Sequence, residues 1–130
     1  MTAYGVLSRG LLSGHWTPDR ELLPGDFRRY GPRFQDGNVA HNLALVDALR
    51  KIAESKGVTV AQLAVAWVAA QGQDIVPLVG ARTRTRLTES LGAAEVELST
   101  TDLAEIDAAV PAGSAAGARY ARIDELDSER

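Results

Sequence analysis

The chain has 130 residues, enough for one domain but well short of the roughly 250 that a closed eight-stranded α/β barrel needs. With 45% hydrophobic and 24% charged residues, the composition is typical of a globular protein that buries a core. The lack of cysteine excludes disulfides and a cysteine nucleophile, the presence of only His15 and His41 disfavours a metal site, and the net charge of −3 disfavours nucleic-acid binding.

The sequence also carries no membrane signal. No stretch approaches about 18 uninterrupted apolar residues, and the first residues lack the basic flank and apolar run of a secretory signal. We therefore expect a cytoplasmic protein that does not contact a membrane.

The first part of the chain predicts a strand, a long loop and a helix. A short apolar run indicates a strand over residues 3–7, and a loop rich in glycine and proline follows over residues 8–39. Loops of this length are usually functional or disordered. Residues 42–56 place apolar side chains three and four positions apart, which predicts an amphipathic helix that Gly57 ends.

A second helix and a second strand are expected next. Thr59 and Gln62 have the spacing of a capping box and open a helix over residues 60–71 that is apolar almost all round, which indicates burial on most sides. The continuous apolar run over residues 74–79 predicts a parallel strand covered on both faces. Pro77 removes one ladder donor, so it favours an edge, a first residue or a bulge.

Two further helices and a tail complete the chain. The pattern predicts helices over residues 83–94 and 100–110, the second ended by Pro111. Residues 112–130 are rich in small and then in charged residues, so we expect a surface tail. The order strand, loop, helices, strand, helices is that of α/β units, and it predicts a helix-rich α/β fold.

Three arginines crowd the start of the helix that follows the second strand. Arg82, Arg84 and Arg86 add positive charge where exposed N–H groups and the helix dipole already supply it, and each such cation costs about 0.3–1 kcal/mol. Gly80 permits close backbone approach and Thr83 offers a hydroxyl, so this turn is a candidate phosphate site. The alternative is an arginine-rich surface turn without a ligand.

The end of the first strand has a related composition. Gly5, Arg9 and Gly10 place a basic side chain among flexible residues, although this feature alone defines no ligand. A GxGxxG fingerprint and a Walker loop are both absent from the sequence, so neither a Rossmann nor a P-loop nucleotide site is predicted.

Several spaced motifs together resemble a known family. Residues 3–14 read AYGVLSRGLLSG, which resembles the segment around the seventh strand of the aldo-keto reductases, usually AYSPLGRGxLTG. The similarity continues in the same order through nearly the whole chain, at Phe27-Arg28, Pro32-Arg33-Phe34, Asn42-Leu43, Gly57-Val58-Thr59, Gln62-Leu63-Ala64, Ala66-Trp67, residues 76–80, residues 87–93, Gly117 and Tyr120.

This resemblance implies a fold and an activity. The fold would be the C-terminal portion of a (β/α)8 TIM barrel, from about the seventh strand onward, with the cofactor across the C-terminal ends of the strands. The activity would be hydride transfer between NADP(H) and a small carbonyl compound or alcohol. The chain would supply cofactor-binding elements, and we expect it to be inactive alone.

The resemblance also assigns cofactor contacts. Tyr4 would stack on the nicotinamide ring, while Gly5, Leu7, Arg9 and Gly10 would line the nicotinamide and pyrophosphate half. The residues implied at the adenosine end are Gly80, Arg82, Thr83 and Arg86 for the 2′-phosphate, with Glu89 and Ser90 near adenine. A phosphate met by guanidinium groups would favour NADPH over NADH, because charge-assisted contacts exist only for the phosphorylated form.

The chain departs from the family pattern at three points. Gly5-Val6 stands where the family usually has Ser-Pro, and Ser90 stands where it usually has Asn, which removes a two-sided hydrogen-bonding partner for adenine. The family's catalytic Asp, Tyr, Lys and His lie on earlier strands, so no catalytic residue is assigned here. Tyr30 and Tyr120 have no Lys close in sequence and are interpreted as ordinary surface or packing residues.

Other interpretations remain open from the sequence. The chain could be a non-catalytic remnant, or a subunit that self-associates or binds a missing N-terminal half through open strand edges. A helix-turn-helix over residues 52–63 is a distant alternative, because the helix over residues 60–71 has no Lys or Arg for phosphate contacts. In the long loop, Trp16, Phe27 and Phe34 either cover a bound cofactor or anchor the loop.

Overall fold

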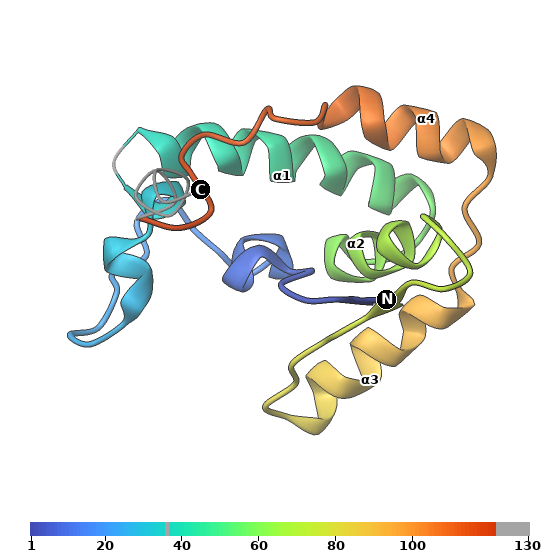
Figure 1. Cartoon of the computed structure of the whole chain (residues 1–130), viewed down its shortest axis with the longest axis horizontal. Helices are drawn as coiled ribbons and strands as arrows, with labels where there is room; N and C mark the ends of the chain where they lie inside the picture. The colour runs from blue at the N-terminus through green and yellow to red at the C-terminus, as the bar shows by residue number, and fades with distance from the viewer. Residues whose placement is uncertain (36, 122–130) are drawn as a thin grey trace, which may run out of the picture.

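The computed structural model describes residues 1–35 and 37–121 of the chain (Figure 1). Residues 122–130 of the expected tail lie outside the described residues. The strands and α-helices are β1 (Thr2–Ala3), α1 (Asn38–Ser55), α2 (Val60–Ala69), β2 (Val76–Pro77), α3 (Arg84–Gly92) and α4 (Thr100–Ala109). The 3-10 helices are η1 (Ser8–Ser13), η2 (Phe27–Tyr30), η3 (Pro32–Phe34) and η4 (Ala93–Glu95). None of the helices in this part of the chain is long and apolar enough to cross a membrane.

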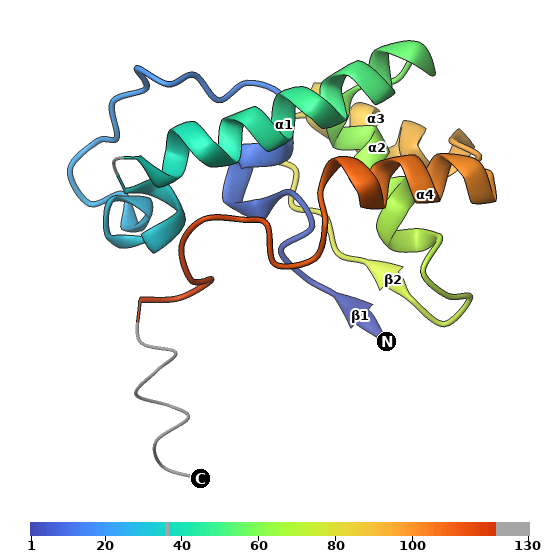
Figure 2. The same ribbon diagram turned by 90° about the horizontal axis from the view of Figure 1, so that it is seen from above.

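The two strands form a short parallel pair, which Figure 2 shows at the edge of the helices. Thr2 lies opposite Val76, and Ala3 lies opposite Pro77. Both strands are shorter than the runs over 3–7 and 74–79 that the sequence predicted. β1 ends where Gly5 takes a positive φ of 74°, which turns the chain out of the strand direction.

The second strand is not covered on both faces, in contrast to the sequence expectation. α2 packs against β2 on one side. Val76 of β2 and Leu78, which follows Pro77, are nevertheless 56% and 50% exposed. A two-stranded sheet has an open edge on each strand, so this apolar run lies at the surface of the described molecule rather than within a sheet.

The core lies between α1, α2 and α4. Leu49 and Ile52 of α1 pack with Leu63 of α2 and Ile106 of α4, and Leu63 is only 1% exposed. Burying each such side chain contributes about 1.5–3 kcal/mol. α1 begins at Asn38, four residues before the predicted start, and includes His41.

Local hydrogen bonds explain where two of the helices begin. The Thr59 hydroxyl accepts a hydrogen bond from the Gln62 N–H, and the Gln62 side chain accepts one from the Thr59 N–H, so the predicted capping box is present at α2. Ser99 and Asp102 form a second reciprocal capping box at α4. The helical parts of the fold are therefore specified by neighbouring residues.

The long loop folds back onto the helices instead of extending from them. Trp16 is buried, with its ring centroid 5.0 Å from that of Phe34, and the guanidinium of Arg28 lies 5.2 Å from the Trp16 ring. Trp16 thus anchors the loop, which was one of the two sequence interpretations for this residue.

Asn42 of α1 ties the C-terminal segment to the loop. Its buried side chain donates hydrogen bonds to the carbonyls of Arg33 (3.1 Å) and Ala116 (2.9 Å) and accepts one from the Ala116 N–H (2.8 Å). Gly117 packs so closely against Pro32 that a Cβ would lie 2.6 Å from the proline carbonyl. The chain therefore crosses the start of α1 and lies beside the loop segment that carries Pro32 (Figure 1).

Candidate functional site

The turn that follows β1 has an unusual backbone. Gly5 and Gly10 have φ values of 74° and 104°, and the non-glycine residues Ser8 and Arg9 also have positive φ, at 47° and 57°. A non-glycine residue in this region costs about 1–2 kcal/mol. Such conformations persist only where the surrounding structure enforces them, and they cluster at ligand sites.

Arg28 of η2 enforces this backbone from outside the turn. Its Nη1 donates to the Arg9 carbonyl (3.2 Å), while its Nε donates to both carboxylate oxygens of Asp26 (2.9 and 3.1 Å). The hydrogen bond from Arg28 lowers the pKa of Asp26 to about 2. An ionised carboxylate thus orients the guanidinium that holds the Arg9 peptide.

The turn that follows β2 is open by comparison. The Thr83 hydroxyl accepts a hydrogen bond from the Arg86 N–H (3.3 Å) and caps α3. Arg82, Arg84 and Arg86 are all exposed around this helix start, and a Cβ on Gly80 would find open space. The structure therefore leaves the guanidiniums of this turn accessible to a ligand.

The two turns line one shared concavity of about 710 Å³. Eight residues predicted from the sequence lie on its wall, namely Gly5, Leu7, Arg9, Gly10, Gly80, Arg82, Thr83 and Arg86. Arg20 and Arg28 from the long loop complete a set of five guanidiniums. Among the described lining residues there is no carboxylate, so this donor set fits phosphate groups.

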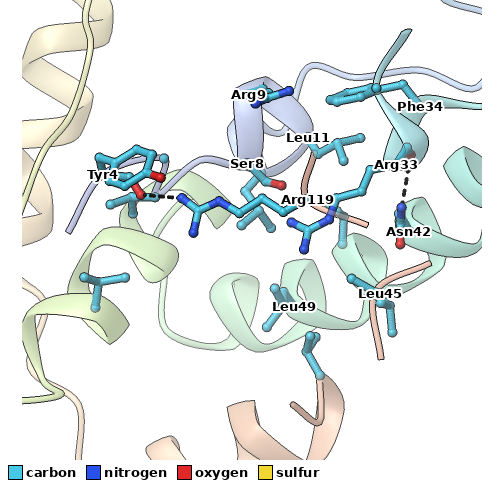
Figure 3. Close-up of a pocket in the computed structure, with 18 of the residues that line it drawn as sticks. Tyr4, Ser8, Arg9, Leu11, Arg33, Phe34, Asn42, Leu45, Leu49 and Arg119 are labelled. Atoms are coloured by element: carbon cyan, nitrogen blue, oxygen red, sulfur yellow. Dashed lines mark hydrogen bonds between the residues drawn. The ribbon is translucent and has the colours of Figure 1, made fainter. Parts of the chain in front are cut away.

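Tyr4 lies beside this concavity, at a second cavity of about 530 Å³ (Figure 3). The two cavities share Gly5, Val6 and Arg9. Glu89 and Ser90 lie on the next turn of α3, are half-buried and do not line either cavity. The carbonyl of Glu89 accepts a hydrogen bond from the Gln62 side chain (3.0 Å), so this backbone is occupied in packing α3 on α2. Their placement near adenine stays a prediction.

The C-terminal segment contributes two residues to which the sequence assigned no site role. The hydroxyl oxygens of Tyr4 and Tyr120 are 2.8 Å apart. Arg119 donates from Nη2 to the Tyr4 carbonyl (3.3 Å), and its guanidinium lies 4.5 Å from the centroid of the Tyr4 ring. Figure 3 shows Arg119 reaching across the cavity toward Tyr4.

These contacts change the acidity of both phenols. The hydrogen bond to Tyr120 raises the pKa of Tyr4. The same hydrogen bond, with the nearby guanidiniums of Arg119 and Arg9, lowers the pKa of Tyr120. Tyr120 also lines the cavity at Tyr4, whereas Tyr30 lines neither cavity and is 75% exposed.

The geometry defines a class of protein. Ligands in parallel α/β sheets bind beyond the carboxyl ends of the strands, and here the turns at both carboxyl ends meet in one arginine-lined concavity. The described chain is therefore a helix-rich α/β protein with a candidate anion-binding site at its strand ends.

Comparison with known proteins identifies the family. The family model described as "Aldo/keto reductase family" matches residues 1–111. This chain belongs to the aldo/keto reductase family.

Three relatives illustrate the match. The chain is 40% identical to aldo-keto reductase yakc of Schizosaccharomyces pombe, whose name carries NADP(+), over 92% of this chain and 35% of that protein. It is 38% identical to a probable aldo-keto reductase of Glycine max, over 90% of this chain and 34% of that protein. The solved glycerol dehydrogenase of Gluconobacter oxydans superposes with a TM-score of 0.78 and 33% identity, over 84% of this chain and 33% of that one. The chain thus spans about a third of the length of these relatives.

Proposed function

We propose that this chain forms the NADP(H)-binding part of an aldo-keto reductase (β/α)8 barrel, as the C-terminal portion of that barrel. The observation that carries the proposal is the shared concavity, in which five arginines converge from the ends of two parallel strands and the long loop. Arg28 is paired with the Asp26 carboxylate, so the other four guanidiniums remain to contact phosphate groups of one ligand. The full barrel would transfer a hydride between the nicotinamide and a small carbonyl compound or alcohol.

The turn after β2 would hold the 2′-phosphate. Arg82 and Arg86 both line the concavity, together with Thr83, the N-cap of α3. This arrangement gives two charge-assisted donors beside a helix N-terminus, a combination that suits a dianionic phosphate. Such contacts support a preference for NADP(H) over NAD(H).

The turn after β1 would hold the nicotinamide half. The left-handed backbone at Gly10 brings the main chain to the wall of the concavity, and Tyr4 presents a ring that is 61% exposed. An exposed aromatic face beside a phosphate site suits a flat heterocycle. Bound there, the cofactor supplies the hydride, and this chain binds and orients it.

The chain alone is expected to lack turnover. The acid-base groups of the family would come from the part of the barrel that precedes this segment, and we assign no catalytic residue within residues 1–130. Mixing the chain with NADPH and 4-nitrobenzaldehyde should therefore leave the nicotinamide absorbance unchanged. A steady fall that scales with protein concentration would overturn this part of the proposal.

The binding proposal is tested with fragments of the cofactor. Titration calorimetry with 2′,5′-ADP and with 5′-AMP should show binding of the first at least about tenfold tighter, since charge-assisted hydrogen bonds contribute about 1.5–3 kcal/mol. Arg82→Ala and Arg86→Ala should each remove most of this preference. Arg84→Ala is the matched control, because Arg84 starts the same helix but does not line the concavity. Equal affinity for the two fragments would contradict the proposal.

A partner that completes the barrel is the second part of the proposal. Met1 and Leu91 are 74% and 65% exposed, and Val76 of β2 and the nearby Leu78 are also exposed. A stretch of apolar surface beside open strand edges favours association with the missing strands or with a second copy. Light scattering after sizing chromatography should give a mass above 13.8 kDa, and a sharp monomer would contradict this expectation. A cytoplasmic location belongs to the same proposal, because a cysteine-free chain needs no oxidising compartment.

A non-catalytic remnant would bind the same cofactor fragments. A remnant and a cofactor-binding part of an enzyme are distinguished by adding the remaining barrel portion of a relative to this chain. A chain that complements this portion should restore aldehyde reduction, whereas a remnant should not. The helix-turn-helix alternative loses support in the fold, since Val60, Ala61 and Leu63 at the start of α2 are buried.

A further inference from the structure

Two consecutive residues of the C-terminal segment, Arg119 and Tyr120, contact Tyr4. Its carbonyl accepts from Arg119, its ring face is covered by the same guanidinium at 4.5 Å, and its hydroxyl lies 2.8 Å from that of Tyr120. The guanidinium of Arg9 in turn lies 5.0 Å from the Tyr120 ring. The backbone, the ring plane and the phenol of Tyr4 are thus each fixed by residues about 115 positions away.

Gly5 makes this arrangement possible. A Cβ at this position would lie 3.1 Å from Nη2 of Arg119, and the φ of 74° is one that residues with side chains rarely adopt. Gly5 stands where the sequence pattern of the family usually has Ser, so the guanidinium uses space that a side chain would otherwise fill.

We propose that Arg119 and Tyr120 are positioning residues that hold Tyr4 in place. The positive charge of Arg119 on one face of the Tyr4 ring then makes a nicotinamide stacked on the opposite face bind more tightly in its reduced form than in its oxidised form. This inference rests on the proposed function. The reduced ring is neutral and the oxidised ring carries a positive charge, and the two forms share the same phosphates. Only the ring therefore distinguishes them at this position.

The size of the effect follows from distance. A nicotinamide stacked about 3.5 Å from the Tyr4 ring would place its charge about 8 Å from the guanidinium. Coulomb repulsion at that separation, in a medium between water and a protein surface, weakens the oxidised form about fivefold relative to the reduced form. Neither Tyr4 nor Arg119 forms an ion pair with a carboxylate among the described residues that would cancel this field.

The test is the ratio of two dissociation constants, Kd for NADP+ divided by Kd for NADPH, measured by titration calorimetry on the full chain. Arg119→Gln should lower this ratio about fivefold, mainly by tighter NADP+ binding. Arg119→Lys retains the charge and should keep most of the ratio. Arg50→Gln is the control, because Arg50 lies on α1 and lines neither cavity.

Two further variants separate charge from position. Tyr120→Phe removes the phenol contact and leaves the cation, so it should weaken both forms of the cofactor alike without changing the ratio. Gly5→Ala displaces the guanidinium and should shift the ratio in the direction of Arg119→Gln, which keeps the test available if that variant folds poorly.

The outcomes distinguish the two proposals. An unchanged ratio in both Arg119→Gln and Gly5→Ala, with cofactor still bound, would overturn the inference and leave the proposed function standing. Failure of the unaltered chain to bind either NADP+ or NADPH would overturn the proposed function and the inference with it.

Discussion

The turns after β1 and β2 line the same concavity and are built in opposite ways. The first carries strained residues at Ser8 and Arg9 and is held by Arg28 and Arg119, which lie far away in the sequence. The second is exposed, and its ordering contact within the turn is the cap formed by Thr83.

This difference indicates that the two turns respond differently to a bound ligand. A turn held by distant contacts is already in its binding conformation, so little ordering free energy is lost when a ligand arrives. A turn stabilised by its own cap can adjust to the ligand. Four substitutions test this contrast, in order of decreasing expected effect.

Gly117→Ala should have the largest effect. The new Cβ would lie 2.6 Å from the Pro32 carbonyl at a φ of 84°, so the C-terminal segment must move away from the first turn. We expect a loss of about 3 kcal/mol in the free energy of unfolding, from steric clash and backbone strain together, measured by urea denaturation. Gly113→Ala is the matched control, because Gly113 has a φ of 81° and nothing within 4 Å of its Cβ. Equal losses for the two variants would show that the close approach to Pro32 does not matter.

Arg28→Ala tests the other support of the first turn. It removes the donor to the Arg9 carbonyl and leaves the Asp26 carboxylate without its partner. We expect a loss of about 1–2 kcal/mol in unfolding free energy and faster amide exchange in the turn after β1, with the turn after β2 unchanged. Arg50→Ala removes an exposed ion pair and should cost about 0.5 kcal/mol or less. Unaltered exchange in Arg28→Ala would refute the role given to this residue.

Thr83→Ala tests the second turn. Loss of the cap should reduce the unfolding free energy by about 1 kcal/mol and weaken 2′,5′-ADP binding, while exchange in the first turn stays the same. Ser99→Ala removes the cap of α4 and should cost a similar amount without affecting ligand binding. If both variants bind the ligand equally, the Thr83 cap does not organise the phosphate site.

Asp26→Asn should have the smallest effect of the four on the free energy of unfolding at neutral pH. The amide oxygen of the asparagine can still accept a hydrogen bond from Arg28, so less is lost than in Arg28→Ala. The pKa of Asp26 is lowered from 3.8 to about 2 in the folded chain, so its ionised form stabilises the fold above pH 4 and this contribution disappears as the pH falls toward 2. The stability difference between the unaltered chain and the variant should be constant from pH 7 to about 5 and then narrow. Asp102, whose pKa is also about 2, contributes to both proteins and cancels in the difference. A difference that grows on acidification would contradict the pairing.

The local parts of this protein follow from its sequence. The caps of α2 and α4 use residues three positions apart, and the apolar periodicity of α1 identifies the core face, because neighbouring side chains are enough to specify a helix. The arginine-rich turn at Gly80 and the motif from Ala3 to Gly14 indicated an anion site and the family, and the two turns do line one concavity.

The tertiary structure decided what no local pattern encodes. It shortened both strands, since each pairs with a single neighbour, and it began α1 at Asn38. It also brought Arg28 and Arg119 to the turn after β1. The one sequence signal for the contact of Arg119 was the segment at residues 117–120, in which a glycine is followed two positions later by Arg-Tyr. Contacts across more than a hundred residues depend on how the helices pack, and packing is a property of the assembled surfaces rather than of any segment alone.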